Sequence, residues 1–243
     1  MKTNKTDKTV RISIPPAKFG VLHLTLIGDS MLVQDRFDQK SQDELQKGKI
    51  IEPEEEKNAP DECEVDDQPQ TQLGGRKPTK KKIDPEKVWN ERRYISAQGW
   101  DGFKACALRN GSVDAIRLVK GLKMNMAKMS IFVMADGYDR FEDFTGLVKI
   151  IGKPERFDYV ARNRMGQAVM THRPRYWPWK AKVRIRFDAG QFDASDIINL
   201  INRVGMQIGV GCGRVYSKNS CGQGWGAFHI DRSEKAKLEV IEL

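Results

Sequence analysis

Alternating apolar and polar residues predict several strands that each bury one face. The clearest alternation lies in residues 180–188, where one face would be apolar and the other basic. The apolar set is Ala181, Val183, Ile185 and Phe187, and the basic set is Lys180, Lys182, Arg184 and Arg186. Similar patterns predict strands at 10–14, 22–26, 128–137, 146–152 and 225–230, an edge strand at 234–243, and a short strand or extended entry at 88–95.

A different spacing predicts helices. In residues 193–205 the apolar side chains recur every three or four positions, as on one face of a helix. Asp193 or Ser195 is placed to cap the first turn, and Gly205 is placed to end the last.

An earlier helical pattern begins near Trp100 and is expected to break at Asn110–Gly111. Ser112 would then cap a second helical segment. The resulting order of strands and helices predicts an α+β fold, in its simplest form a ferredoxin-like (RRM-like) split βαβ sheet with an inserted β-hairpin.

Composition divides the chain into three parts. Residues 1–33 would supply the first strands, and residues 86–243 the remainder of one domain. Between them, residues 34–85 are almost empty of aromatic and periodic apolar side chains, with nine acidic residues and one lysine between Glu52 and Asp67. Such a segment cannot bury enough apolar surface to order itself, so we interpret it as a disordered acidic insertion.

Residues 153–179 have little core pattern and are expected to form a projecting hairpin with Met165–Gly166 near its tip. From Lys149 to Arg186 there are eleven Lys or Arg residues and two acidic residues. Aromatic residues are interleaved with these arginines, a combination that suits phosphates and unpaired bases. The alternative is a solvated hairpin whose tryptophans dock on the core.

Glycines are concentrated in the segment GVGCGRVYSKNSCGQGWGAFHI, residues 209–230. Dense glycine allows backbone N–H groups to approach an anion closely. The segment matches neither a Walker loop nor a dinucleotide fingerprint, because no GK[ST] follows and it comes after a predicted helix. A packing role, in which the turn passes close to the sheet, is the alternative.

The charge balance favours a polyanionic partner. The 243 residues carry a formal net charge of +9, which suits nucleic acid or an anionic membrane surface. No stretch is apolar enough for a membrane span, and the four cysteines form no CxxC pair, so we expect a reducing, cytoplasmic location. No metal site or cofactor is expected, since Cys212, Cys221 and His229 lack a fourth zinc ligand.

Three segments together resemble the RAMP (repeat-associated mysterious protein) superfamily, which includes backbone subunits of CRISPR effector complexes. They are GDSMLV (28–33), YISAQGWDGFKACALR (94–109) and the glycine-rich segment 209–230. The ending of the chain is also similar to that of uncharacterised phage and prophage proteins. The resemblance implies a subunit that assembles on RNA or single-stranded DNA, as a homo-oligomer or in a multi-subunit complex, in the cytoplasm of a bacterial or phage-infected cell.

The candidate nucleic-acid ligands follow from the charges and from this resemblance. The resemblance implies that Lys104 and Arg109 contact phosphates, and that glycines let the loop lie close to the strand. The full set is Lys104, Arg109, Arg162, Arg164, Arg173, Arg175, Tyr176, Trp177, Lys182, Arg184, Gly211, Gly213, Arg214, Lys218, Gly222 and Gly224.

We expect binding without catalysis, and no catalytic residue is assigned. Two alternatives remain. His172, within the basic hairpin, is a conceivable general base for an RNA-processing endonuclease. A phage structural or assembly protein would instead use the basic surface to bind an acidic protein patch.

Overall fold

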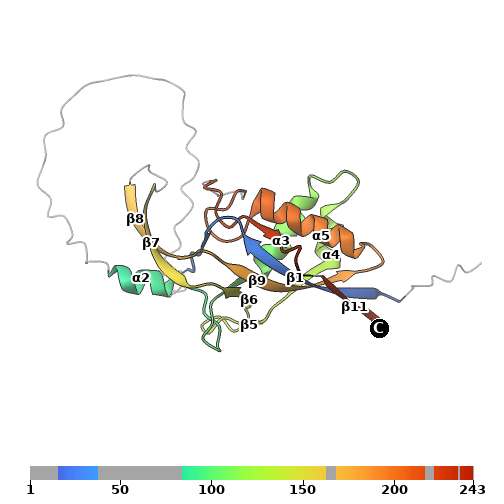
Figure 1. Ribbon diagram of the computed structural model, residues 1–243, viewed down its shortest axis with the longest axis horizontal. Helices are drawn as coiled ribbons and strands as arrows, with labels where there is room; N and C mark the ends of the chain where they lie inside the picture. Colours follow the sequence, from blue (N-terminus) through green and yellow to red (C-terminus); the bar gives the residue numbers. More distant parts are fainter. Residues whose placement is uncertain (1–15, 38–83, 163–167, 217–221, 235, 243) are drawn as a thin grey trace, which may run out of the picture.

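The computed structural model describes residues 16–37, 84–162, 168–216, 222–234 and 236–242. The strand predicted at 10–14, most of the predicted insertion 34–85 and the hairpin tip lie outside these residues. At the start of that insertion, Gln34 and Arg36 are buried, so residues 34–37 belong to the folded part and not to a disordered segment. Figure 1 shows the arrangement of the described elements. The strands are β1 (Lys18–Gly28), β2 (Leu32–Val33), β3 (Gly102–Lys104), β4 (Ile131–Met134), β5 (Gly137–Tyr138), β6 (Gly146–Ile151), β7 (Pro154–Arg162), β8 (Ala168–Tyr176), β9 (Lys180–Asp188), β10 (Phe228–Ile230) and β11 (Lys237–Glu242). The helices are α2 (Pro85–Glu91), α3 (Ala105–Ile116), α4 (Met124–Ser130) and α5 (Ala194–Arg203), with a π-helical turn η1 (Val204–Ile208).

Two βαβ units interleave to form the main sheet. The first unit is β1–α3–β4 and the second is β9–α5–β10. Strands β1 and β9 are central antiparallel neighbours, with β10 beside β1 and β4 beside β9. This arrangement is a split βαβ sheet, so the α+β, ferredoxin-like prediction is confirmed.

Further strands extend this sheet on both sides. Strand β6 pairs with the same edge of β9 as β4 does, but nearer the start of β9. Strands β3 and β5 both pair with β6. Strand β11 pairs with β1 from Lys18 to His23, which confirms the predicted edge strand. One end of the sheet therefore has the order β11-β1-β9-β4, and the other has the order β10-β1-β9-β6-β3.

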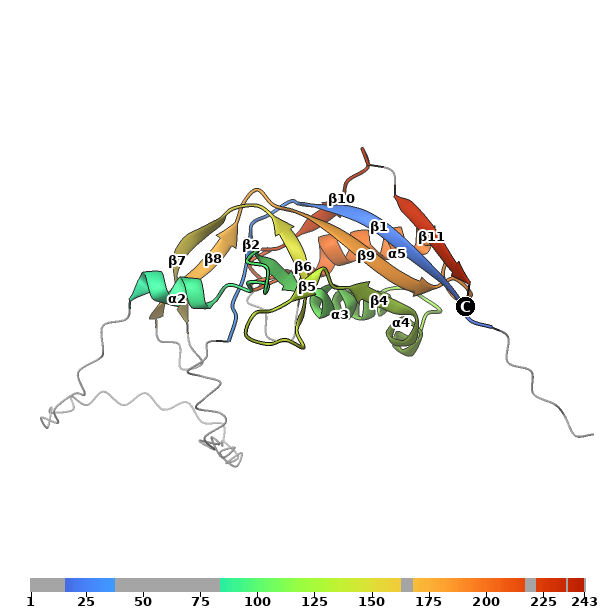
Figure 2. The same ribbon diagram turned by 90° about the horizontal axis from the view of Figure 1, so that it is seen from below.

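The core lies between the sheet and its helices, which are on one side of it (Figure 2). Apolar residues of β1 and β9 point toward α3 and α5 and are almost completely buried. These residues include Leu22, Leu24 and Leu26 of β1, Val183 and Ile185 of β9, Leu108 and Ile116 of α3, and Ile197 and Ile201 of α5. The inward face predicted for residues 180–188 is thus confirmed.

The second sheet is the hairpin. Strands β7 and β8 pair along their whole length, from Pro154↔Tyr176 to Arg162↔Ala168, and β2 pairs with β8. In Figure 2 the hairpin curves away from the main sheet toward the side on which the helices lie, with α2 beside it. The residues expected to form a hairpin therefore do so.

Four local predictions are wrong. The helix predicted from near Trp100 begins only at Ala105, because Gly102–Lys104 pairs with β6 as strand β3. The extended segment predicted from residue 88 is largely helix α2, which begins earlier because Asp84 accepts a hydrogen bond from the Glu86 amide (3.0 Å) and Pro85 follows it. Helix α3 continues through Asn110–Gly111 without a break. Helix α5 starts at the predicted Asp193 cap but does not stop at Gly205, because the chain continues as η1.

Candidate nucleic-acid interface

The outer face of the main sheet is the face opposite α3, α4 and α5. No helix among the described residues covers it (Figure 2). The alternating sequence of β9 places four basic side chains here, because the intervening apolar residues face the core. They are Lys180, Lys182, Arg184 and Arg186. We call this row the β9 ridge.

Most of the β9 ridge is free to meet an anion. Lys180, Lys182 and Arg186 are exposed, and none of them forms an ion pair within 4.0 Å with a carboxylate of the described residues. Arg184 differs, because its guanidinium donates to the Ala135 carbonyl (2.9 Å) and contacts Asp136 (3.2 Å). Lys182 and Arg184, both predicted ligands, thus lie together, but only Lys182 is unpaired.

Two aromatic rings that the sequence analysis did not select accompany the β9 ridge. The Arg186 guanidinium lies 5.5 Å from the Phe19 ring and 4.9 Å from the Phe132 ring. These residues belong to the neighbouring strands β1 and β4. Phe19 is out of phase with Leu22, Leu24 and Leu26 of β1, and Phe132 with Ile131 of β4, and this alternation was the signal that could have identified them. A cation between flat rings on an open sheet is suited to stacked bases and phosphates.

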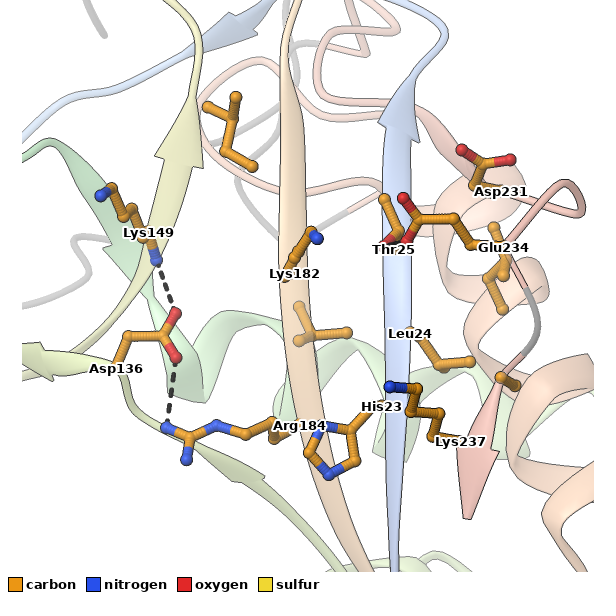
Figure 3. Close-up of a pocket in the computed structure, with 14 residues that line it drawn as sticks. His23, Leu24, Thr25, Asp136, Lys149, Lys182, Arg184, Asp231, Glu234 and Lys237 are labelled. Atoms are coloured by element: carbon orange, nitrogen blue, oxygen red, sulfur yellow. Dashed lines mark hydrogen bonds and ion pairs between the residues drawn. The ribbon is translucent and has the colours of Figure 1, made fainter.

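A pocket of about 560 Å³ lies on the same face, between β6, β9, β1 and the connection from β10 to β11 (Figure 3). Lys149, Lys182 and Arg184 stand on one part of its lining. Glu234 and Asp231 stand on another part, near Thr25. The pocket therefore combines cations and carboxylates, whereas the sequence analysis assigned only cations to this region.

The hairpin arginines are occupied by carboxylates. Arg173 contacts Asp35 (2.6 Å) and also donates to the Cys212 sulfur (2.7 Å). Arg175 donates twice to Glu155, at 2.9 and 3.1 Å. Both predicted phosphate ligands would have to leave these partners to bind an anion. The side chain of Arg162, and all of Arg164 and Lys218, lie outside the described structure.

The two predicted aromatic ligands at the hairpin base differ in exposure. Tyr176 is fully buried, and its hydroxyl donates to Asp101 (2.9 Å). Burial, together with the nearby Asp101 carboxylate, raises the pKa of Tyr176 far above its ordinary value. The prediction that Tyr176 stacks on bases is therefore wrong. Trp177 is 48% exposed and remains accessible.

The glycine segment is mainly a packing device. At Gly211 (φ +82°) a Cβ would lie 2.5 Å from the Val33 carbonyl oxygen, and at Gly213 (φ +65°) one would lie 2.2 Å from the Trp225 ring. Their assignment to a nucleic-acid strand is thus corrected, because the bare backbone serves contacts within the protein. Gly222 and Gly224 differ, since a Cβ at either position would meet open space. Arg214 donates to the Tyr216 carbonyl at 3.1 Å.

The Trp225 ring joins this segment to the hairpin. It meets the rings of Phe157 and Tyr159 edge-on, with centroids 5.6 and 5.3 Å away. Phe157 and Tyr159 stack on each other at 5.2 Å. The glycine segment and the hairpin are therefore held together by aromatic packing, on the helix side of the sheet.

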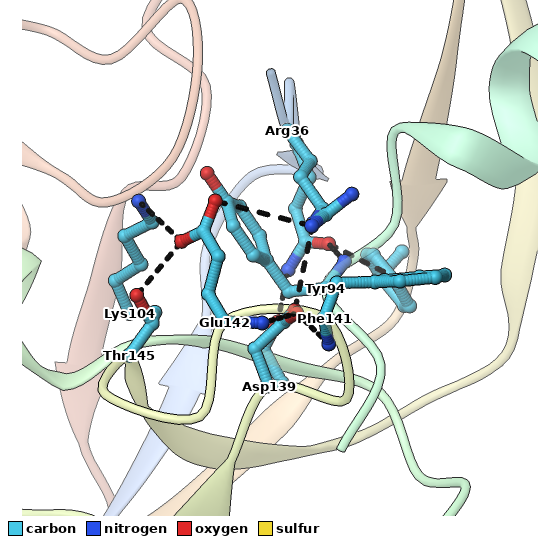
Figure 4. Close-up of polar contacts among 10 residues, drawn as sticks. Arg36, Tyr94, Lys104, Asp139, Phe141, Glu142 and Thr145 are labelled. Carbon is cyan, nitrogen blue, oxygen red and sulfur yellow. Dashed lines mark hydrogen bonds and ion pairs between the residues drawn. The ribbon is translucent and has the colours of Figure 1, made fainter. Parts of the chain in front are cut away.

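Lys104 and Arg109, the remaining predicted ligands, are near other groups of the protein. Lys104 lies 4.0 Å from Glu142 and 5.1 Å from the Tyr94 ring (Figure 4). Arg109 donates to the backbone carbonyls of Ile131 and Lys128, which ties α3 to α4 and β4. Arg109 thus has a structural role, and its contact with phosphate stays a prediction.

The network around Lys104 is largely neutralised. Arg36 is buried and lies 3.6 Å from Asp139 and 3.9 Å from Glu142 (Figure 4). Glu142 also accepts a hydrogen bond from Thr145 (2.8 Å), and Asp139 accepts bonds from two backbone amides of its own loop. These contacts fix the loop from residue 139 to 145. The Glu142 carboxylate in this loop partly neutralises the charge of Lys104.

None of the helices in the described ranges is long and apolar enough to span a bilayer. Within those same ranges, no group of three or more His, Cys, Asp or Glu side chains is arranged to hold a metal ion.

Comparisons with known proteins give structural likenesses but no match by sequence. No protein-family model and no curated protein matches the sequence. Among solved structures, the chain is similar to a chain of "Cryo-EM structure of the Type III-B Cmr-beta bound to cognate target RNA", with 8% sequence identity and a TM-score of 0.41. The match covers 93% of this chain and 61% of that one, so this chain spans about three fifths of its length. The fold assignment rests on the strand topology described above and not on this likeness.

Proposed function

We propose that the protein binds RNA or another single-stranded nucleic acid on the outer face of its main sheet, without catalysis. The observation that carries the proposal is the row of unpaired cations on β9, Lys180, Lys182 and Arg186, beside the rings of Phe19 and Phe132. The formal net charge of +9 favours the same kind of partner.

The mechanism is electrostatic attraction combined with stacking. Side chains on alternate residues of one strand are about 7 Å apart, so the β9 ridge can follow the backbone of an extended nucleic-acid strand. Its cations would neutralise phosphates and release counterions, which makes affinity fall as salt rises. The partly exposed rings of Phe19 and Phe132 would stack on bases of any sequence.

We further propose that the protein acts as a subunit of a larger assembly in the cytoplasm of a bacterial or phage-infected cell. This part of the proposal rests on the resemblance of segments 28–33, 94–109 and 209–230 to RAMP-superfamily sequences. The split βαβ sheet with an inserted hairpin is compatible with it. Partners in such an assembly would be further copies of the chain or other subunits.

Removing the unpaired cations of the β9 ridge tests the proposed binding surface. In the triple variant Lys180→Ala, Lys182→Ala, Arg186→Ala we expect affinity for labelled single-stranded RNA to fall at least about tenfold at low salt. The slope of log affinity against log salt should decrease by about 2, since each phosphate contact contributes roughly 0.7 for single strands. Fluorescence anisotropy over a salt series measures both quantities.

A matched control removes three charges from the helix side. Lys120, Lys123 and Lys128 are exposed and lie around α4, so replacing all three by alanine gives the same change in net charge. This control should bind nearly as well as the unmodified protein. If the two triple variants lost the same affinity for RNA, net charge alone would explain the binding, and the proposed interface would be wrong.

A further inference from the structure

The pocket on the outer face differs from the β9 ridge because it also contains carboxylates. Its volume of about 560 Å³ lies within the range of small-ligand sites. Figure 3 shows Lys182 between two groups, with Lys149, Asp136 and Arg184 on one side and Thr25 and Glu234 on the other. A surface that bound only phosphates would gain nothing from the Glu234 carboxylate.

The cationic part of the pocket has a fixed arrangement. The two Asp136 oxygens accept from the Arg184 guanidinium (3.2 Å) and from the Lys149 amide (3.0 Å), so this carboxylate is occupied. The side chains of Lys149 and Lys182 form no ion pair within 4.0 Å in the described part of the chain. They lie on the adjacent strands β6 and β9, which are about 5 Å apart. Together they can hold one phosphate group.

The acidic part is held in place by the sheet. The Thr25 hydroxyl donates to Glu234 Oε2 at 2.6 Å, which orients this carboxylate over β1. Thr25 is the cross-strand partner of Lys182, so the carboxylate lies over the strand next to that of Lys182, and Lys149 is one strand further away. Within the described residues Oε1 accepts no hydrogen bond, and Oε2 has a second lone pair. The group is therefore an oriented acceptor that faces the pocket.

A ligand that matches both parts has a phosphate at one end and neighbouring hydrogen-bond donors at the other. Among nucleotides, guanine presents two adjacent N–H donors, which a carboxylate accepts as a pair. Adenine and cytosine present a single amino group beside an acceptor nitrogen, and uracil presents one N–H between two carbonyl groups. Those acceptors would face the carboxylate and weaken the contact.

We propose that this pocket holds one guanine nucleotide of the bound strand, with its phosphate on Lys149 and Lys182 and its base edge on Glu234. The inference rests on the proposed function, and it adds a preference for one base to a surface that otherwise binds any sequence.

Calorimetric titration with mononucleotides tests the pocket directly. The probes are GMP, dGMP and UMP, titrated into the full chain. We expect GMP and dGMP to bind equally, about tenfold more tightly than UMP, as expected for one bidentate contact. Glu234→Gln should abolish this preference, because its amide keeps the bond from Thr25 but presents donors to the guanine donors. Lys182→Ala should weaken all three nucleotides alike.

Glu91→Gln, on the distant helix α2, is the matched control and should leave the preference intact. GMP binding no tighter than UMP, or a preference that survives Glu234→Gln, would overturn the inference. If GMP and UMP bind alike and both bind more tightly than dGMP, the carboxylate contacts the ribose 2′-hydroxyl and the base assignment is wrong.

The same proteins titrated with labelled single-stranded RNA separate the two proposals. Oligonucleotide binding without a guanine preference removes the pocket inference and leaves the proposed function standing. A guanine preference that depends on Glu234, without oligonucleotide binding, supports the pocket and removes the proposed function.

Discussion

The glycine segment and the β9 ridge were both candidates for binding, and the structure uses them in opposite ways. In the glycine segment the bare backbone at Gly211 lies against the Val33 carbonyl, so its conformational freedom serves internal packing. On β9 the apolar residues pack and the basic residues between them face outward. A cluster of glycines thus indicates close approach without saying to what, whereas strict alternation specifies both faces of a strand.

The hairpin sharpens this comparison. Its arginines outnumber its acidic residues in the sequence, yet Arg173 and Arg175 are both paired with carboxylates. The partner of Arg173, Asp35, is far away in the sequence. A local excess of basic residues therefore does not identify the cations that remain free, because distant carboxylates can neutralise them.

The largest expected effect concerns packing in the glycine segment. Gly211→Ala should lower the free energy of unfolding by about 3 kcal/mol, since it combines a left-handed backbone with a Cβ in contact with main-chain atoms. Gly224→Ala has a similar φ (+75°) but open space around the new Cβ, so it should cost about 1 to 2 kcal/mol. Chemical denaturation measures both. Equal losses would mean that the segment is not packed as described.

The second effect separates pairing from binding. Arg173→Ala should lower the free energy of unfolding by about 1 to 2 kcal/mol, because it removes the contacts of Arg173 with Asp35 and with the Cys212 sulfur. Arg92 still donates to Asp35 (2.8 Å), which keeps the loss moderate. Its affinity for single-stranded RNA should change less than twofold. Lys182→Ala should show the reverse, with unchanged stability and weaker binding. A strong loss of RNA binding in Arg173→Ala would show that the hairpin belongs to the RNA-binding surface.

Much of the fold was accessible from sequence because the strand and helix patterns are local. The alternation in 180–188 gave β9 and its two faces, and the periodicity of 193–205 gave α5 with its Asp193 cap. Helix α2 was missed because the short segment from residue 88 was interpreted as extended, although Asp84 and Pro85 before it are typical of a helix start. The break at Asn110–Gly111 did not occur because Gly111 is buried against Val204 of η1, a tertiary contact that the local pattern does not contain.

The candidate site was less accessible because it depends on pairing between distant residues. Lys182 was selected correctly as an outward cation, but the burial of Tyr176 depends on Asp101 and the core around it. Glu234 was not selected, because its role follows from a hydrogen bond with Thr25, at the other end of the chain. Contacts of this kind are invisible to spacing and composition.

The smallest expected effect tests whether the hairpin is catalytic or only paired. His172 Nδ1 lies 2.7 Å from Asp158 Oδ1, across the two hairpin strands. The hydrogen bond with His172, followed by the charge of Arg156, lowers the pKa of Asp158. Because the folded-state pKa is lower than the unfolded one, the pair stabilises the fold above the unfolded pKa and loses this contribution as pH falls through the folded pKa.

In His172→Ala the pKa of Asp158 should therefore return toward its ordinary value, as measured by NMR titration of the side-chain carboxyl. The loss of stability should be less than about 1 kcal/mol, since the Asp158 carboxylate is one-third exposed. RNA affinity should be unchanged, and no cleavage should appear in either protein. Cleavage by the unmodified chain that disappears in His172→Ala would make the histidine a general base and replace the non-catalytic proposal with an endonuclease.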